Sequence, residues 1–408
     1  MSSLRHRTNW KIPREMRRPS ASLSVLLTAA AALLPTPHAN AADSDEANTH
    51  ASYRFSEYDE DALRGTVIGD PRRYRVLSQQ LNVDTKLDGG AWGLKLDATH
   101  EVMSGSSPWF VAPDAQLRPV QVLSGATIRD HRSALSVALT QNPGASANTT
   151  YTASYSGERD YHAAAIGAER SQPLDAATTL GYGGSFSHDV IKPTDAASYN
   201  RIAHATKNTA STFASLAWVL DRDSVLQAGV QVNFGHGYLT DPYKLFSYGA
   251  DILAERRPDR RVEAAGLVRY RHSYAQIDAA LHLDYRYAQD SWGLTSQTLE
   301  ASWYQGLGHG WRLVPTLRWY SQSAARFYAP FLAAPAGQRF YSSDYRLGTF
   351  GAFSTSINVR KAIGRWELSL GAERYHSARG LALGGGEAPV PAMVNSTRAW
   401  AGLDFGFD

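Results

Sequence analysis

The sequence predicts an all-β protein, a transmembrane antiparallel up-and-down β-barrel of about sixteen strands. Three observations support this fold class. Apolar and polar side chains alternate through much of the 408-residue chain, as they do in strands that have one apolar and one polar face. Short turns and long loops follow one another between these segments. No run of about 20 apolar residues occurs that could span a bilayer as a helix.

The first 41 residues have the pattern of a secretory signal peptide. Six basic side chains and one acidic side chain come first, an apolar run at residues 21–34 follows, and Ala39-Asn40-Ala41 forms a small-x-small cleavage site. The apolar run is too short for a membrane anchor. We therefore expect residues 1–41 to be removed on export, residues 42–50 to form a short periplasmic segment and residues 51–408 to form the barrel.

Charge and cysteine content exclude several classes of function. The chain has a formal charge of +3 and a pI near 8.9, but residues 1–41 contribute +5, which leaves −2 for the rest. The basic pI therefore gives no support for a nucleic-acid partner. The absence of cysteine excludes disulfides, thiol catalysis and cysteine-based metal sites.

Alternation is clearest in the second half of the chain. Between residues 277 and 287, Ile277, Leu281 and Tyr285 share one face, and Asp278 and Asp284 share the other. The same pattern predicts strands at residues 225–234, 261–273, 311–320, 346–361, 366–375 and 397–407. Fainter examples lie at residues 77–87, 92–102, 133–139, 149–155, 178–186 and 212–220. The weakest lie at residues 51–58, 162–168 and 294–305, where Gln297 falls on the apolar face.

The connections between these strands favour a membrane barrel. Short turns are predicted at residues 88–90, 142–145, 172–175, 221–224, 306–310 and 363–365. Most other connections are long, at residues 59–70, 103–129, 189–204, 235–260, 322–343 and 377–392. Short turns on one rim and long extracellular loops on the other are typical of outer-membrane barrels. An even number of strands places both chain ends on the short-turn, periplasmic rim.

Solvation assigns the two faces of the predicted sheet. The outer face of a barrel in lipid must be apolar, whereas a lumen can be wet and charged. Aromatic residues of the apolar face gather near both strand ends, as in the two girdles of such barrels. They are Trp92, Trp303, Trp311, Trp366, Phe405 and Phe407 near the short turns, and Phe186, Phe234, Tyr287 and Trp319 near the long loops. A soluble β-sandwich would have shorter strands and no such rims.

The last predicted strand indicates the localisation. Ala399, Ala401, Leu403, Phe405 and Phe407 alternate with polar or small residues, which resembles the terminal strand recognised by the outer-membrane assembly machinery. We therefore expect a protein of the Gram-negative cell outer membrane. Its expected partners are outer-membrane lipid and this assembly machinery.

Several motifs are more specific than a barrel requires. They are Gly235-His236-Gly237-Tyr238, Asp241-Pro242-Tyr243-Lys244-Leu245-Phe246, Asp290-Ser291-Trp292-Gly293, Tyr320-Ser321-Gln322-Ser323-Ala324-Ala325 with Phe327-Tyr328, and Glu373-Arg374-Tyr375. They resemble the bacterial outer-membrane proteins classed as domain of unknown function 3570, over almost the whole chain after the signal segment. The resemblance implies no established activity. It does imply an envelope redox context, because such proteins are often encoded beside a small lipoprotein, a thioredoxin-like protein and a periplasmic flavin-transfer enzyme.

The predicted lumen has two unlike halves. The candidate lumen-lining residues on the charged half are Arg269, Arg271, Asp284, Arg286, Glu300, Arg312, Arg318, Arg346 and Glu373. The opposite half carries small residues, among them Ser136, Thr150, Thr152, Ser154, Thr179, Gly181, Gly183, Ser185, Ser211 and Ser215. One interpretation is a pore whose electric field selects solutes. The other is that the charges pair and hold a solvated wall.

The loop at residues 235–260 is the strongest candidate for a constriction or plug, with the loop at residues 103–129 as another. Its candidate residues are Tyr238, Asp241, Pro242, Tyr243 and Lys244. The alternative is that the aromatic side chains pack this loop against the barrel mouth.

The sequence gives little support for catalysis, metals or cofactors. His282 shares a predicted face with Asp278 and Asp284 beside a strand that bears Ser296 and Ser302, so a barrel-embedded hydrolase is a minor hypothesis. The histidines lack metal-ligand spacing, and no cofactor motif is present. We expect a non-enzymatic, porin-like channel or transport component. The alternative is a non-conducting barrel that scaffolds an envelope redox or assembly complex with lipoprotein or thioredoxin-like partners.

Overall fold

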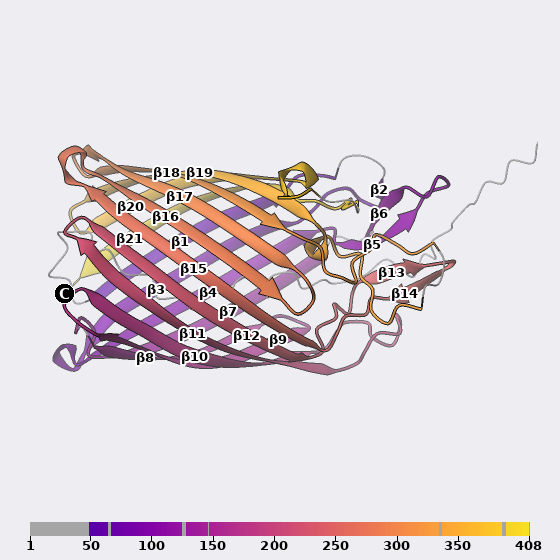
Figure 1. The fold of residues 1–408 in the computed structure, drawn as a ribbon, viewed down its shortest axis with the longest axis horizontal. Helices are drawn as coiled ribbons and strands as arrows, with labels where there is room; N and C mark the ends of the chain where they lie inside the picture. The colour runs from indigo at the N-terminus through magenta and orange to yellow at the C-terminus, as the bar shows by residue number, and fades with distance from the viewer. Residues whose placement is uncertain are drawn as a thin grey trace, which may run out of the picture.

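The computed structural model describes residues 49–63, 67–124, 128–145, 147–333, 337–385 and 389–407. Within these ranges, sixteen long strands form one closed barrel (Figure 1). The predicted fold class is confirmed. No helix in the described ranges has the length and apolar character needed to cross a membrane. The predicted signal peptide at residues 1–41 lies outside the described residues.

The barrel strands follow one another along the chain, and each pairs with the next in antiparallel register. They are β1 (Thr49–Glu60), β3 (Arg75–Leu87), β4 (Trp92–Gly105), β7 (Ile128–Gln141), β8 (Asn148–Gly157), β9 (Tyr161–Pro173), β10 (Thr178–Ile191), β11 (Ala205–Asp221), β12 (Ser224–Gly237), β15 (Arg260–Tyr274), β16 (Ala279–Asp290), β17 (Thr295–Gly308), β18 (Trp311–Gln322), β19 (Phe350–Ile363), β20 (Trp366–Ala378) and β21 (Asn395–Phe407).

The first and last strands close the sheet. β1 pairs with β21 along its whole length, from Thr49 opposite Phe407 to Glu60 opposite Ser396, and its other edge pairs with β3. A sheet closed in this way has no open edge, so its backbone hydrogen bonds can all be satisfied in lipid.

All the predicted strands are present, including the three weakest. β1 begins at Thr49, slightly before the expected start of the barrel at residue 51. Gln297 does lie on the outer face of β17, where its side-chain oxygen accepts a hydrogen bond from the Tyr285 hydroxyl at 2.9 Å. The polar side chain on the apolar face therefore has a partner beside it.

In two places a predicted strand includes residues that form a turn. The strand expected from residue 346 begins at Phe350, and Arg346 lies instead in the short 3₁₀ helix η3 (Tyr345–Leu347). The Asp344 side chain accepts a hydrogen bond from the backbone N–H of Arg346 and so starts this turn. The strand expected from residue 277 begins at Ala279, because residues 275–277 form the 3₁₀ turn η2 (Ala275–Ile277) and Asp278 is left-handed, with φ of 48°.

The outer face is apolar, as predicted. Ile166, Val230 and Leu370 are 61–66% exposed near the middle of their strands, which is the arrangement expected for side chains that face lipid. Aromatic residues mark the short-turn ends of the strands, where the rings of Trp366 and Phe405 lie 4.2 Å apart between centroids. Phe186 and Phe234 are exposed near the opposite ends.

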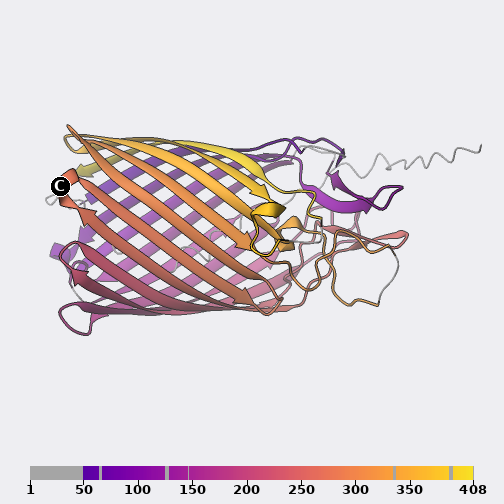
Figure 2. The same cartoon turned by 45° about the horizontal axis from the view of Figure 1, so that its top comes forward.

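The long connections are folded, which alternation alone did not predict. β2 (Val67–Ile68), β5 (Pro108–Pro113) and β6 (Pro119–Leu123) form one small sheet, and β13 (Leu245–Tyr248) and β14 (Asp251–Ala254) form a hairpin. Both lie beyond the barrel wall at the end opposite the C-terminus (Figures 1 and 2). A buried apolar cluster that includes Trp292, Phe327, Tyr328 and Leu347 packs other parts of these loops together.

An arginine at a lipid-facing position should destabilise the barrel far more than an arginine in the lumen. We expect Leu370→Arg to lower the free energy of unfolding in lipid vesicles by about 2–4 kcal/mol. The control is Ser356→Arg on the inner face, where Glu373 is its direct cross-strand neighbour. Denaturant titration of both variants measures the difference, and equal losses would contradict the assigned faces.

Candidate functional site: the lumen wall and the folded outer loops

Four predicted lumen residues form one row across neighbouring strands. Arg269 on β15 lies opposite Asp284 on β16, Asp284 lies opposite Glu300 on β17, and Glu300 lies opposite Arg318 on β18. Direct cross-strand partners share one face of a sheet. The structure therefore brings these four charges together on the inner wall, with the two carboxylates between the two guanidinium groups.

The charges of this wall pair with one another. Arg271 donates a hydrogen bond to Asp284, and Arg269 Nε lies 3.9 Å from the same carboxylate. Arg286 Nη2 lies 2.9 Å from Glu263 Oε1. Arg318 Nε and Glu300 Oε2 are 4.0 Å apart and both side chains are partly exposed. Such contacts between partly solvated groups contribute little stability each, and they leave the wall polar.

The remaining lumen candidates have different surroundings. Arg312 lies directly opposite Arg360, so two like charges face each other towards the short-turn rim. Glu373 accepts a hydrogen bond from the Ser354 hydroxyl and lies opposite Arg398. Arg346 is not on the barrel wall, because it belongs to the loop between β18 and β19.

The opposite wall is less empty than its small residues indicate. Ser185 faces Ser211 and Gly181 faces Ser215, as expected. Phe213, however, lies opposite Gly183 on the same inner face and is only 5% exposed. Its position between Ser211 and Ser215, which alternation places inward, was the signal that could have identified it.

The motif Asp241-Pro242-Tyr243-Lys244 forms a tight turn in the loop between β12 and β15. The Tyr243 backbone N–H donates to Asp241 Oδ1 at 3.0 Å, and the Lys244 backbone N–H donates to the Asp241 carbonyl at 3.2 Å. This is the turn chemistry that aspartate and proline favour. Tyr243 and Lys244 are buried, and the Tyr238 backbone N–H donates to the Thr206 carbonyl at 2.9 Å.

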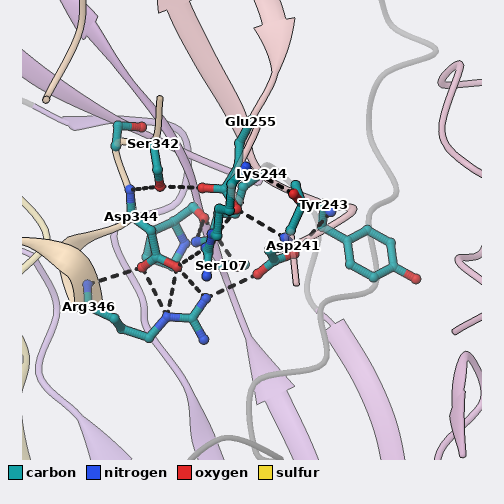
Figure 3. Close-up of polar contacts among 12 residues, drawn as sticks. Ser107, Asp241, Tyr243, Lys244, Glu255, Ser342, Asp344 and Arg346 are labelled. Atoms are coloured by element: carbon teal, nitrogen blue, oxygen red, sulfur yellow. Dashed lines mark hydrogen bonds and ion pairs between the residues drawn. The ribbon is translucent and has the colours of Figure 1, made fainter. Parts of the chain in front are cut away.

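A buried ion network joins this loop to the loop between β18 and β19 (Figure 3). Arg346 Nε lies 2.9 Å from Asp344 Oδ1, and Arg346 Nη2 lies 3.1 Å from Asp241 Oδ2. Arg257 Nη2 lies 2.6 Å from Glu255 Oε1 and 2.8 Å from Asp344 Oδ2. The two loops are therefore connected through charges that are largely buried.

Further contacts extend the network to other loops. Lys244 Nζ donates to the backbone carbonyl of Pro108, on β5. In the loop between β1 and β3, Arg73 Nε lies 2.8 Å from Glu60 Oε2, and both side chains are under 5% exposed. The Arg73 guanidinium lies 5.5 Å from the ring centre of Tyr345, the residue after Asp344. Four outer loops thus meet in one folded layer, which we call the cap.

In the cap, burial and neighbouring opposite charges shift the pKa values of the ionisable groups in opposite directions. Burial alone would raise the pKa of Asp344, but Arg346, Lys244 and Arg257 hold this pKa well below its ordinary value. Burial lowers the pKa of Lys244, and Asp344 opposes this shift. Burial also raises the pKa of Glu255, against the effect of Arg257. With Asp241 and Arg346 included, the network contains three acidic and three basic groups, so buried opposite charges offset one another.

The sequence did not indicate Glu255, Arg257, Ser342 or Asp344 as site residues. The Ser342 hydroxyl donates to Glu255, although 87 positions separate them in the chain. The only sequence feature that could have indicated these residues is the acidic and basic pair at residues 255 and 257 and the similar pair at residues 344 and 346. Such pairs are common in exposed loops.

The hydrolase hypothesis does not gain support from the geometry. The Ser302 hydroxyl lies 2.8 Å from the Thr316 hydroxyl, and the His282 ring packs on Tyr304 with 4.4 Å between ring centroids. Asp278 lies in a turn and not on the inner face of a strand. His282 lies directly opposite Ser302, but the described residues show no hydrogen-bonded series of nucleophile, base and orienting carboxylate at this place.

Comparison with known proteins places the chain in a family without a known function. The model of a family described as "Protein of unknown function (DUF3570)" matches residues 21–396. No protein of curated function matches the chain in sequence.

Similarity to solved structures concerns the barrel fold. The chain is 12% identical to the siderophore receptor PirA from Pseudomonas aeruginosa, covering 87% of this chain and 61% of that one, with a TM-score of 0.41. It is 9% identical to CdiB from Acinetobacter baumannii, covering 88% and 60%, with a TM-score of 0.45. It is 11% identical to OccK5 (OpdH) from Pseudomonas aeruginosa, covering 88% and 98%, with a TM-score of 0.42. The chain thus spans about three fifths of the first two proteins.

Removing one charge from the cap network should open the outer loops without unfolding the barrel. In Asp344→Asn, Arg257 and Arg346 lose their shared buried partner, and we expect the local stability of the cap to fall by about 3–5 kcal/mol. Amide hydrogen exchange in residues 337–349 measures this opening. The control is Asp114→Asn, which removes an ion pair whose arginine is 72% exposed. Unchanged exchange in Asp344→Asn would contradict the role of the network.

Proposed function

The chain belongs to the DUF3570 family of proteins of unknown function, and on this premise we propose that it is an outer-membrane channel or a component of a transport system. The observation that carries the proposal is the inner surface of the sixteen-stranded barrel. Closed barrels of about 16–18 strands leave an interior too wide for side chains to fill. Here that interior is lined by polar and charged residues, which favour water.

The unlike halves of the lumen support passage of polar solutes. The row of Arg269, Asp284, Glu300 and Arg318 presents both signs of charge on one wall. Serine and glycine residues, together with Phe213, line the wall formed by β10 and β11, and the lumen lies between the two walls. A solute in this space would lie within the field of the charged wall, and such a field influences which ions and polar molecules pass.

The proposed constriction is the cap, with Tyr238, Asp241, Pro242, Tyr243 and Lys244 as its central residues. Burial of Tyr243 and Lys244 supports a firmly held loop. The same burial supports the simpler interpretation that the loop only packs the barrel mouth.

A second candidate function is a non-conducting scaffold for an envelope redox or assembly complex. The observation that favours it is the buried ion network, which ties several outer loops into one layer. A closed and firm outer end would suit a barrel that holds partners, such as an envelope lipoprotein or a thioredoxin-like protein.

Under either candidate function, we propose that the protein is exported through a cleaved signal segment. We also propose that the outer-membrane assembly machinery recognises β21 and inserts the barrel.

Solute flux into liposomes tests the channel proposal against the scaffold. Purified protein is inserted into vesicles, and the rate of osmotic swelling is measured with neutral sugars of increasing size. We expect swelling to fall steeply with sugar size, since a polar lumen of fixed width acts as a sieve. Vesicles that contain folded barrel and swell no faster than empty ones would favour the scaffold.

Deleting the central loop segment tests the constriction. Removal of residues 238–248 should raise the swelling rate and the sensitivity of cells to large antibiotics, because the segment bearing Tyr243 and Lys244 would no longer cover the mouth. The reference is the unmodified protein at the same amount of folded barrel per vesicle. Swelling rates equal to those of the unmodified protein would show that the segment at residues 238–248 only packs the loop.

A further inference from the structure

Three acidic side chains meet at the outer end of the barrel wall, on a part of the sheet that the cap network does not use. Asp130 is near the start of β7, and Glu158 and Asp160 lie in the short link between β8 and β9. One carboxylate oxygen from each residue lies within 4.8 Å of those of the other two. The residues are 3%, 4% and 2% exposed, respectively.

Two arginines lie near this cluster. Arg132 Nε lies 3.9 Å from Glu158 Oε1, and Arg132 Nη1 lies closer to Glu101, at 2.9 Å. Arg159 adds a second positive charge near Asp130. Buried carboxylates gathered in this way need a counter-charge or a proton.

Two of the carboxylate oxygens lack a protein partner. Among the described residues, Asp130 Oδ2 and Asp160 Oδ1 are fully buried and accept no hydrogen bond. Buried polar atoms are nearly always paired. An oxygen that is buried, unpaired and next to other carboxylates is therefore the feature expected of a cation ligand, independently of the acidic cluster itself.

The surrounding contacts hold the carboxylates in place. The His131 backbone N–H donates to Asp130 Oδ1 at 2.9 Å, and the Lys192 backbone N–H donates to the Asp160 carbonyl at 2.8 Å. The Tyr243 hydroxyl donates to Asp160 Oδ2 and accepts a hydrogen bond from the Thr194 backbone N–H at 3.0 Å. Partners of this kind orient ligands around a metal ion.

We propose that Asp130, Glu158 and Asp160 bind one calcium ion. Oxygen atoms that bind Ca²⁺ lie about 2.3–2.6 Å from it, so two ligands of one ion are at most about 5 Å apart. The three carboxylates meet this condition. An all-carboxylate set of hard oxygen ligands suits Ca²⁺ better than Zn²⁺, which prefers histidine and cysteine. Mg²⁺ retains several waters and demands octahedral geometry.

The site has a structural consequence that does not depend on conduction. A calcium ion there would join β7 to the link between β8 and β9, and through Asp160 and Tyr243 it would steady the loop between β12 and β15. The tyrosine of the Asp241-Pro242-Tyr243-Lys244 motif thus acts as a positioning residue for the metal site and as an anchor for the cap.

Calcium titration of the full-length protein tests the proposal. The folded barrel in detergent is freed of metals with a chelator and titrated with CaCl₂ by calorimetry, with MgCl₂ as a comparison. We expect one saturable calcium site with a Kd of about 10⁻⁴–10⁻³ M, as in other extracellular calcium sites, weaker magnesium binding and a rise in Tm with calcium. Absence of saturable calcium binding by the unmodified protein would overturn the proposal.

Matched variants locate the site. The double variant Asp130→Asn, Glu158→Gln should lose at least about tenfold in calcium affinity, and Tyr243→Phe should lose about tenfold because it leaves the ligands but removes an orienting contact. Asp251→Asn, at an exposed acidic residue of β14, is the control and should bind like the unmodified protein. Circular dichroism verifies that each variant is folded. A folded double variant that binds calcium with unchanged affinity would place the ion elsewhere and overturn the assignment.

Discussion

Backbone amides and carbonyls inside a bilayer have no water to bond to, so a sheet that crosses the membrane must leave no edge open. The pairing of β1 with β21 meets this requirement, and the rest of the molecule depends on it. Once the sheet is closed, period-two alternation sends every second side chain to lipid and the others to the lumen. The apolar outer belt and the charged inner wall therefore both follow from closing an alternating sheet into a barrel.

The outer end of the molecule is stabilised by different interactions from those of the barrel wall. Its loops lie beyond the barrel wall, and they are held together by charges buried among one another. Charges removed from water are stable only when each has a partner and the total is balanced. The network around Asp344 meets this condition with Arg257 and Arg346. At the acidic cluster, Asp130 Oδ2 and Asp160 Oδ1 have no hydrogen-bond partner among the described residues. These two unpaired oxygens distinguish the candidate cation site from the paired network around Asp344.

Alternation was sufficient to predict the strands, because in a barrel the environment of each residue repeats with a period of two. It predicted the inward direction of Arg269, Asp284, Glu300 and Arg318, since these lie in unbroken strands. It failed at Arg346, where a local side-chain contact from Asp344 starts a turn in place of a strand. The same alternation places Phe213 inward, between Ser211 and Ser215, but it does not show how completely this ring is buried.

Alternation could not predict the cap or the acidic cluster, because their contacts join loops that are far apart in the sequence. Arg346 and Asp241 are 105 positions apart, and Tyr243 and Asp160 are 83 positions apart. Contacts between loops of that separation leave no periodic trace in the sequence. The motif around Tyr243 did mark an important segment, but the partners that give it a role became visible only when the loops were placed in space.

The central claim is that a polar lumen runs through the closed barrel and carries solutes. Single-channel recording in a planar bilayer tests it most directly, with purified, folded, full-length protein on one side of the membrane. The claim predicts discrete current steps of reproducible size after insertion. A flat baseline from protein that is demonstrably inserted and folded would contradict it.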